Sequence, residues 1–286
     1  MKKKNQAWSI LSKIMMGLTL LFFYLPIFYI ILFSFNGKKS LQVHSGISLE
    51  NGFSLDGFSL KWYEKVFNPD SVTDYLGSIS TTVSIAIWAT IISTILGTIT
   101  AIGLSKSGKV IRTSVERINE LPIMNPDIVT GISLLMLFSA FTFIEKGWTT
   151  MLLAHIMFCT PFVILSIMPK LRTLDPNLID AAMDLGCTPF QAMYKVIIPQ
   201  IIPSIIAGAL IAFTMSFDDF VISYFVKGVG TNNISTLVYS LSSRTDPSIY
   251  ALSTLIIVMI TVMLILANII PMIHGKIKKI KNKHEA

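Results

Sequence analysis

Charged side chains are scarce in this chain. They make up 14% of its 286 residues, whereas soluble globular domains carry about 25%. Hydrophobic residues account for 52%, and the mean hydropathy is +0.67. This balance argues against a soluble globular protein and indicates a membrane protein.

Common catalytic and metal-binding motifs are also missing. The sequence has neither a phosphate-binding G-x-x-x-x-G-K-S/T loop nor an H-E-x-x-H zinc helix. Its two cysteines, Cys159 and Cys187, and its four histidines show no metal-ligand spacing or disulfide framework. We expect the cysteines to be packing residues, and His155, in an apolar run, to be a hydrogen-bonded packing residue. These absences favour a protein that is not an enzyme and holds no metal.

Long apolar runs without Lys or Arg recur six times along the chain. Each is near the ~20 residues that a helix needs to cross a bilayer. Irregular or open-edged structure cannot face lipid, because its backbone polar groups would stay unpaired. We therefore predict an all-α integral membrane protein with six transmembrane helices between residues 14 and 273. The predicted spans cover 14–35, 79–104, 121–143, 149–168, 203–225 and 250–273.

Basic residues are unevenly distributed between these runs. Most of the 23 Lys and Arg lie in the N-tail 1–13, the 105–120 loop, the 169–202 loop and the basic C-tail 274–286. Because basic residues concentrate on the cytoplasmic side of membrane proteins, we predict that both termini are cytoplasmic. The net charge of +7 therefore reports topology, and no nucleic-acid partner is expected. The C-tail is also suited to contact anionic lipid.

The loop 169–202 is more organised than a simple connection. Asp175 and Pro176 predict the start of a short helix, and Gly186 is suited to end it in a left-handed conformation. Thr188 is placed to cap a second short helix. The predicted helix–Gly–helix elbow displays small residues where the surface of a partner can come close.

Within this loop, the stretch DAAMDLGCTPFQAMYKVIIP resembles the EAA loop of permease subunits of binding-protein-dependent ABC importers. The family pattern is E-A-A, three residues, G, nine residues, I-x-L-P. Every spacing matches, with Asp for Glu, Val for Ile and Ile for Leu. The resemblance implies a type I ABC importer permease fold, also called MetI-like. It also implies which residues couple the chain to an ATP-hydrolysing subunit: Asp180, Ala181, Ala182, Gly186 and Pro199.

Three further stretches, FDDFVISYF, NPDIVTGISLLMLF and HIMFCTPFV, are similar to PotC-type permeases of spermidine/putrescine importers. This implies a polyamine cargo and a place in the bacterial inner membrane. The implied partners are a PotB-like second permease, two PotA-like ATPase subunits that bind the ATP, and a PotD-like polyamine-binding protein. Two alternatives remain: an ABC permease for thiamine, ferric ion or an opine, and a secondary transporter, which would typically show inverted repeats.

Carboxylates inside the predicted spans give independent support for a cationic cargo. Asp127, Asp218 and Asp219 lie in runs without Lys or Arg. A charge near the bilayer centre costs about 2.5–3.5 kcal/mol on insertion scales, so such residues normally face a cavity and serve function. Unneutralised acids suit a polyamine, whose ammonium groups are joined by an apolar chain. The alternative interpretation is structural: capping groups, hydrogen-bond partners or protonated acids.

The adjacent acids Asp218 and Asp219 cannot point the same way on an intact helix. Ser216 lies about 60° from Asp219 and about 160° from Asp218 around a regular helix. The stripe of small residues that includes Ser216 therefore nominates Asp219 for the translocation pathway, unless a local break brings Asp218 into it. In the external segment 37–78, Trp62 is either an interfacial aromatic or a cation–π contact for the amine.

Overall fold

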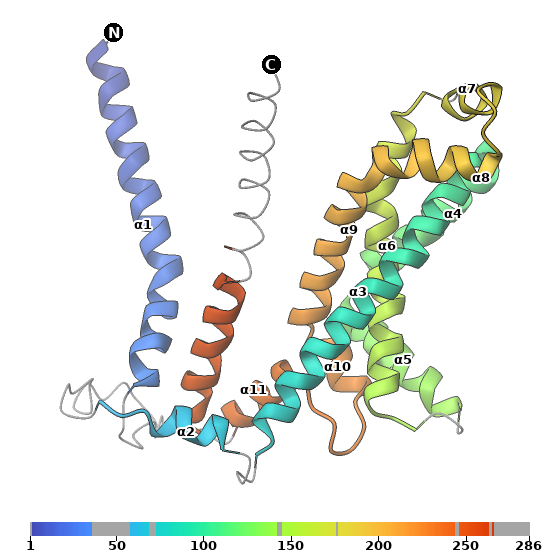
Figure 1. Ribbon diagram of the computed structural model, residues 1–286. Coiled ribbons are helices and arrows are strands. Elements are labelled where there is room, and N and C mark those ends of the chain that lie inside the picture. The colour runs from blue at the N-terminus through green and yellow to red at the C-terminus, as the bar shows by residue number, and fades with distance from the viewer. Residues whose placement is uncertain are drawn as a thin grey trace, which may run out of the picture. The chain divides into compact units, whose positions relative to one another are not determined.

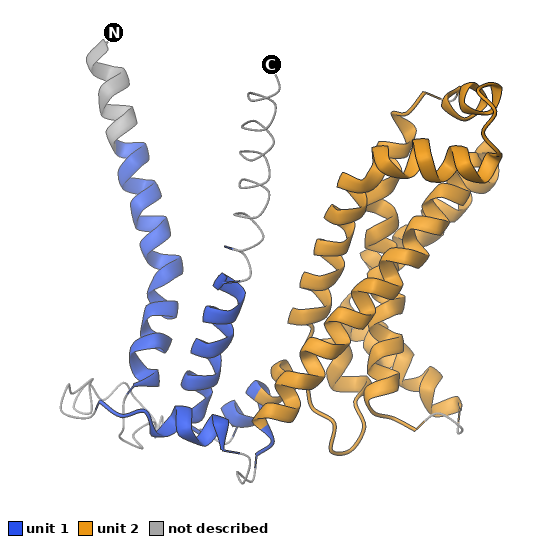
Figure 2. Ribbon diagram, in the orientation of Figure 1, with its two compact units in different colours: residues 1–74, 238–286 blue, residues 75–237 orange. Residues whose placement is uncertain are grey.

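The computed structural model describes residues 2–35, 58–68, 73–141, 145–175, 177–243, 246–262 and 265, and its regular structure there is almost entirely helical. The chain divides into two compact units, one formed by residues 1–74 with 238–286 and the other by 75–237 (Figure 2). The predicted C-tail 274–286, most of the external segment 37–78 and Pro176 lie outside the described residues.

The first unit contains α1 (Lys2–Ser34), α2 (Lys61–Phe67) and an apolar helix over Ser248–Val262 (Figure 1). An ion pair of 2.7 Å joins Lys65 of α2 to Asp246, just before the last helix. Burial alone would raise the pKa of Asp246, but hydrogen bonds from Lys65 and from the backbone of the next turn outweigh it and lower that pKa. This contact therefore ties two distant parts of the unit together most firmly when the carboxylate is ionised.

Three long helices form the centre of the second unit: α3 (Tyr75–Lys106), α6 (Trp148–Arg172) and α9 (Ile198–Asp218), which pack against one another (Figure 1). Glycine allows this close approach. A Cβ on Gly97 would lie 2.7 Å from the Val163 side chain, and a Cβ on Gly208 would lie 3.4 Å from the Val163 backbone. The small residues of the predicted spans therefore serve helix packing.

The run 121–143, predicted as one span, is divided between α4 (Lys109–Met124) and α5 (Asp127–Ala140), which are bent by 102°. The cause is local. Asn125 is extended, with ψ of 140°, as expected for a residue before proline. Pro126 then supplies the residue from which α5 starts. Asp127 is consequently the first residue of α5 and does not lie inside one continuous span.

The run 203–225 is also divided. α9 ends at Asp218, and α10 (Val221–Val226) begins after two residues that are not helical. Asp219 is extended, with φ of −65° and ψ of 125°. The premise of an unbroken helix through both acids is therefore wrong. α11 (Ile234–Ser243) follows and contains the boundary between the two units.

The predicted loop 169–202 folds into α7 (Leu178–Asp184), α8 (Pro189–Ala192) and the π-helical turn η3 (Met193–Ile197), which continues into α9. α7 begins later than predicted, because the Asp175 carboxylate accepts a hydrogen bond from the Asn177 N–H at 2.9 Å in a turn that precedes the helix.

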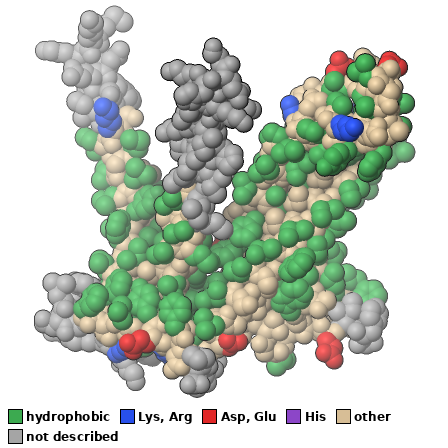
Figure 3. Space-filling view, in the orientation of Figure 1, with side chains coloured by type: hydrophobic (Ala, Val, Ile, Leu, Met, Phe, Trp, Pro, Cys, Tyr) green, Lys and Arg blue, Asp and Glu red, His purple; other side chains and the backbone are tan. Residues whose placement is uncertain are grey.

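Apolar helices of membrane-spanning length are present in both units. In the described ranges there are four, or five if the bent pair α4–α5 counts as one span. Figure 3 shows charged side chains of the second unit towards its two ends, with a hydrophobic belt between them. The four helices cover Leu11–Ser34, Tyr75–Lys106, Trp148–Arg172 and Pro189–Asp218.

Candidate functional site

The segment that contains α7, α8 and η3 (residues 178–197) is called the elbow below. The turn between α7 and α8 is held by backbone geometry. Gly186 has φ of +88°, a conformation that costs other L-residues about 1–2 kcal/mol. Its N–H donates to the Met183 carbonyl at 2.9 Å, and the Cys187 N–H donates to the Ala182 carbonyl at 3.1 Å. These are the two bonds of a Schellman motif. The predicted left-handed role of Gly186 is confirmed.

The start of α8 also follows the prediction. The Thr188 hydroxyl accepts a hydrogen bond from the Gln191 N–H at 3.3 Å. In return, the Thr188 N–H donates to the Gln191 side-chain carbonyl at 3.2 Å. This reciprocal pair is a capping box. The elbow is thus fixed on both sides of Gly186 by contacts within a few residues.

Large apolar side chains cover the outside of the elbow. Leu185 is 87% exposed, Phe190 is 81% exposed and Tyr194 is also exposed. An apolar patch of this kind on a protein surface marks an interaction site. Of the predicted coupling residues, Ala182 is buried within the elbow. The others are exposed: Asp180, Ala181, Gly186 and Pro199.

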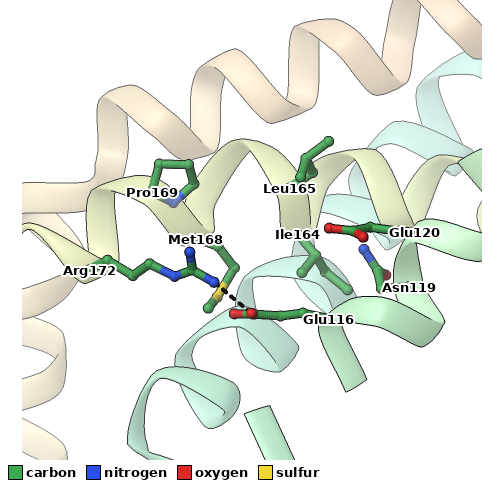
Figure 4. Close-up of a pocket in the computed structure, with 8 residues that line it drawn as sticks. All are labelled: Glu116, Asn119, Glu120, Ile164, Leu165, Met168, Pro169 and Arg172. Atoms are coloured by element: carbon green, nitrogen blue, oxygen red, sulfur yellow. Dashed lines mark hydrogen bonds and ion pairs between the residues drawn. The ribbon is translucent and has the colours of Figure 1, made fainter. Parts of the chain in front are cut away.

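Polar contacts hold α4 against α6. Glu116 forms an ion pair with Arg172 at the elbow end of α6 (Figure 4). Nearer the middle of α6, the Pro161 carbonyl accepts a hydrogen bond from the Asn119 amide at 3.1 Å. A cavity of about 110 Å³ lies between these helices. A larger cavity, of about 460 Å³, is lined by both basic and acidic side chains, among them Asp180 of α7. The cavity in Figure 4 is lined by Glu116, Asn119, Glu120, Ile164, Leu165, Met168, Pro169 and Arg172.

At the other end of α9, the carboxylate of Asp219 caps α10. Its two oxygens accept hydrogen bonds from the N–H groups of Ile222 at 3.2 Å and Ser223 at 2.7 Å. The side chain is only 8% exposed. The Asp219 carbonyl accepts a further hydrogen bond from the Asn233 amide at 3.0 Å. Asp219 therefore satisfies N–H groups that the first turn of a helix leaves unpaired.

His155 of α6 connects the two sides of this break. Its Nδ1 lies 2.7 Å from the hydroxyl oxygen of Ser216 on α9, and its Nε2 lies 3.0 Å from that of Ser223 on α10. Nε2 is also 3.5 Å from an oxygen of Asp219. The ring is 1% exposed. His155 is thus a hydrogen-bonded packing residue, as predicted.

The two adjacent acids have different surroundings. Asp218, the last residue of α9, is exposed, and within the described ranges its carboxylate makes no hydrogen bond or ion pair. Asp127, at the start of α5, is also exposed. Ser216 is buried with Asp219. The small-residue stripe faces the interior of the unit, so it does not favour Asp219 over Asp218 for an open pathway.

Trp62 lies in the first unit, and its side chain is 7% exposed. The ring already faces cations of its own helix. The Lys61 ammonium lies 4.7 Å from the ring centroid, and the Lys65 ammonium lies 6.0 Å away. The burial of Trp62 and the two ammonium groups beside its ring do not favour direct contact with a cargo amine.

The family model for the inner membrane component of binding-protein-dependent transport systems matches residues 93–276. The chain belongs to this family. The permease is 35% identical to the putrescine transport system permease protein PotI of Escherichia coli (strain K12), over 85% of this chain and 84% of that protein. It is 34% identical to the spermidine/putrescine transport system permease protein PotC of Haemophilus influenzae, over 87% and 91%.

Solved structures show the same fold. A bacterial ABC transporter involved in the import of the acidic polysaccharide alginate matches with a TM-score of 0.69 at 15% identity, over 94% of this chain and 96% of that one. An amino acid ABC transporter crystallised with histidines matches with a TM-score of 0.52 at 19% identity, over 73% and 94%. The permease is therefore an all-helical, multi-pass inner membrane subunit with an ABC importer permease fold.

Two residues of the permease site were not identified as such from the sequence. His155 was identified as a packing residue, but its link to Asp219 joins positions far apart in the chain. Asn233 lies outside the predicted spans and gave no signal, although its amide holds the backbone at the break. The sequence signal for this contact was the position of His155 in an apolar run.

Proposed function

We propose that the permease moves a polyamine, putrescine or spermidine, inward across the inner membrane. It forms one half of a translocation pathway whose energy comes from separate ATPase subunits. The relatives named above as putrescine and spermidine/putrescine permeases support this cargo. The physical support comes from carboxylates that form no ion pair with any of the side chains described in the structure.

The exposed carboxylate of Asp218 is the observation that carries the proposal. It lies at the end of α9 away from the elbow, and the 21 residues of α9 span about 30 Å. With the elbow in the cytoplasm, Asp218 faces the external half of the pathway, where an amine from a receptor would arrive. An exposed acid in the apolar run 203–225, with no ion pair to a described side chain, supports a cationic ligand.

Asp127 belongs to the same part of the unit. Like Asp218, it is exposed and stands at a break between helices. The helices that follow the two breaks, α5 and α10, pack against each other. A Cβ on Gly131 of α5 would lie 2.7 Å from the Phe225 ring. We assign Asp218 and Asp127 to successive ammonium groups of the cargo.

The remaining predicted pathway residues act indirectly in this proposal. Asp219 and Ser216 are buried around His155 and fix the break that exposes Asp218. Trp62, with its ring facing two lysines, serves the first unit as an interfacial aromatic. In this proposal the cargo contacts the carboxylates of Asp218 and Asp127, and the buried polar residues around His155 support the helix break behind them.

The proposed topology has six spans and both termini in the cytoplasm, with the sixth span over 250–273. The elbow lies in the cytoplasm against a PotA-like ATPase subunit. A PotB-like permease completes the pathway, and a PotD-like receptor delivers the amine.

A reporter fused after Ala286 and one inserted between Leu185 and Thr188 should both read cytoplasmic. A reporter near His44 should read external, and an external C-terminus would overturn the six-span arrangement.

The cargo is tested by uptake into proteoliposomes that contain the permease with its partner permease, ATPase and receptor. Labelled putrescine or spermidine should accumulate only when ATP is supplied on the ATPase side. Thiamine, ferric ion and an opine should neither accumulate nor compete. Accumulation of one of these in place of a polyamine would overturn the proposed cargo and leave the family assignment intact.

A further inference from the structure

A closed polar cluster lies behind the exposed acid. Its members, which we call the His155 cluster, come from α6, α9, the break between α9 and α10, α10 and the segment before α11. All of them are at most 8% exposed at the side chain. Each has a hydrogen-bond partner within the cluster. The cluster consists of His155, Ser216, Asp219, Ser223 and Asn233.

Both nitrogens of the imidazole are used, one on each side of the break. Nδ1 meets Ser216 on α9, whereas Nε2 meets Ser223 on α10 and lies within 3.5 Å of Asp219. A neutral imidazole has one donor and one acceptor, and each serine hydroxyl can play either part. The ring can therefore bridge the two helices in either tautomer.

The break decides what surrounds Asp218. On an unbroken helix, residues four apart are neighbours, so the apolar side chain of Ile222 would lie beside the Asp218 carboxylate. In the structure Ile222 is instead buried in the core of the unit, and Asp218 is exposed. Exposure of the acid thus depends on keeping α9 and α10 apart.

We propose that His155 is a positioning residue for transport. It holds Asp219 and the two serine hydroxyls, so that α9 ends at Asp218 and does not continue into α10. The cargo amine can then reach the Asp218 carboxylate. The inference rests on the proposed function. In this inference His155 does not touch the cargo, but it controls whether the cargo can reach Asp218, the acid that does.

The first test uses the assembled complex and measures polyamine taken up per ATP hydrolysed. His155→Phe fills the space without hydrogen bonds and should lower this ratio about tenfold, as loss of a supporting hydrogen bond does around metal ligands. His155→Gln places an amide near the Nε2 position and should retain most of the ratio. His155→Asn imitates only Nδ1 and should resemble the Phe variant.

Ser166→Ala provides the matched control. The Ser166 hydroxyl donates to the Ser204 carbonyl at 3.3 Å, so it also joins α6 to α9, but away from the break. This variant should transport like the wild type. The result that contradicts the inference is unchanged uptake per ATP in all three His155 variants, as in Ser166→Ala. If these variants lower only the amount of complex, His155 is merely structural.

The second test reads access to position 218 without any cargo. Asp218→Cys is introduced with Cys159→Ala and Cys187→Ser, and the assembled complex is treated with a water-soluble maleimide. Labelling should be fast with His155, slow with His155→Phe and restored by His155→Gln. Equal labelling in all three would refute the inference even if polyamine uptake is established. The labelling pattern would still support it if the complex proved to carry another cargo.

Discussion

The elbow and the break at Asp219 stand at opposite ends of α9 and both end a helix, but they do so by different means. At the elbow, Gly186 turns the chain with φ of +88°, and all the bonds that close the turn are formed within a few residues. At the break, a carboxylate caps α10 and is supported by His155 and Asn233, which are remote in sequence. One termination is local and the other depends on the tertiary fold.

The two regions also differ in what they offer to partners. The elbow presents Leu185 and Phe190 almost fully exposed, which suits a protein surface that docks onto it. The break hides its polar groups and leaves only Asp218 outward, which suits a small cation. Under the proposed function, ATPase coupling and cargo contact are therefore separated along one helix, so each region can be damaged alone.

The largest expected effect on stability is at the break. Asp219→Ala removes a cap and leaves the N–H groups of Ile222 and Ser223 without their acceptor, so it should lower the stability of the solubilised complex by about 1–3 kcal/mol. Asp219→Asn should lose less stability than Asp219→Ala, because its amide oxygen can still accept one of the two N–H groups that the carboxylate holds. Thermal unfolding in detergent measures both. Equal losses for Ala and Asn would show that charge, rather than capping, matters at this position.

A smaller effect is expected at the elbow. Gly186→Val should cost about 1–2 kcal/mol locally through the positive φ. The variant should insert into the membrane normally but lose ATPase association and uptake together, as pull-down and transport assays would show. Gly103 is the control, since it has open space around it and no positive φ. Full transport by Gly186→Val, matching Gly103→Ala, would remove the coupling role of the elbow.

Polar replacement of the exposed apolar side chains separates docking from folding. Leu185→Ser with Phe190→Ser should change stability by no more than about 0.5 kcal/mol, as expected for surface positions. ATPase association should nevertheless fall, because the apolar contact area is lost. Binding of the purified ATPase to permease in nanodiscs checks this. Unchanged binding would place the docking surface elsewhere.

The smallest effect is expected in the first unit, away from both regions. The pKa of Asp246 is lowered because the hydrogen bonds from Lys65 and Ser248 outweigh burial, which alone would raise it. Its stabilising contribution is therefore present at neutral pH and is lost as pH falls through the lowered pKa. The Lys65 pair is partly exposed, so it contributes at most about 1 kcal/mol. In Lys65→Met, thermal stability should decrease less steeply as the pH is lowered, and uptake at neutral pH should be unchanged.

The contrast also explains what the sequence was able to predict. Gly186 and Thr188 were recognised because the signals that end α7 and begin α8 are adjacent in the chain. The bend at Asn125 was not predicted: the run 121–143 was expected to form one span, although a proline follows Asn125. The break after Asp218 was raised only as an alternative, since an apolar run gives no sign of a cap that relies on His155 from another helix.

The most direct test of the account compares Asp218→Asn with Asp219→Asn in the reconstituted importer, with uptake, basal ATP hydrolysis and complex assembly measured on the same samples. Both changes remove a charge with little change of shape. The account predicts that Asp218→Asn assembles and hydrolyses ATP normally but loses most polyamine uptake, whereas Asp219→Asn retains more of it. Wild-type uptake by Asp218→Asn, and by the double Asn variant, would contradict the claim that this acid receives the cationic cargo.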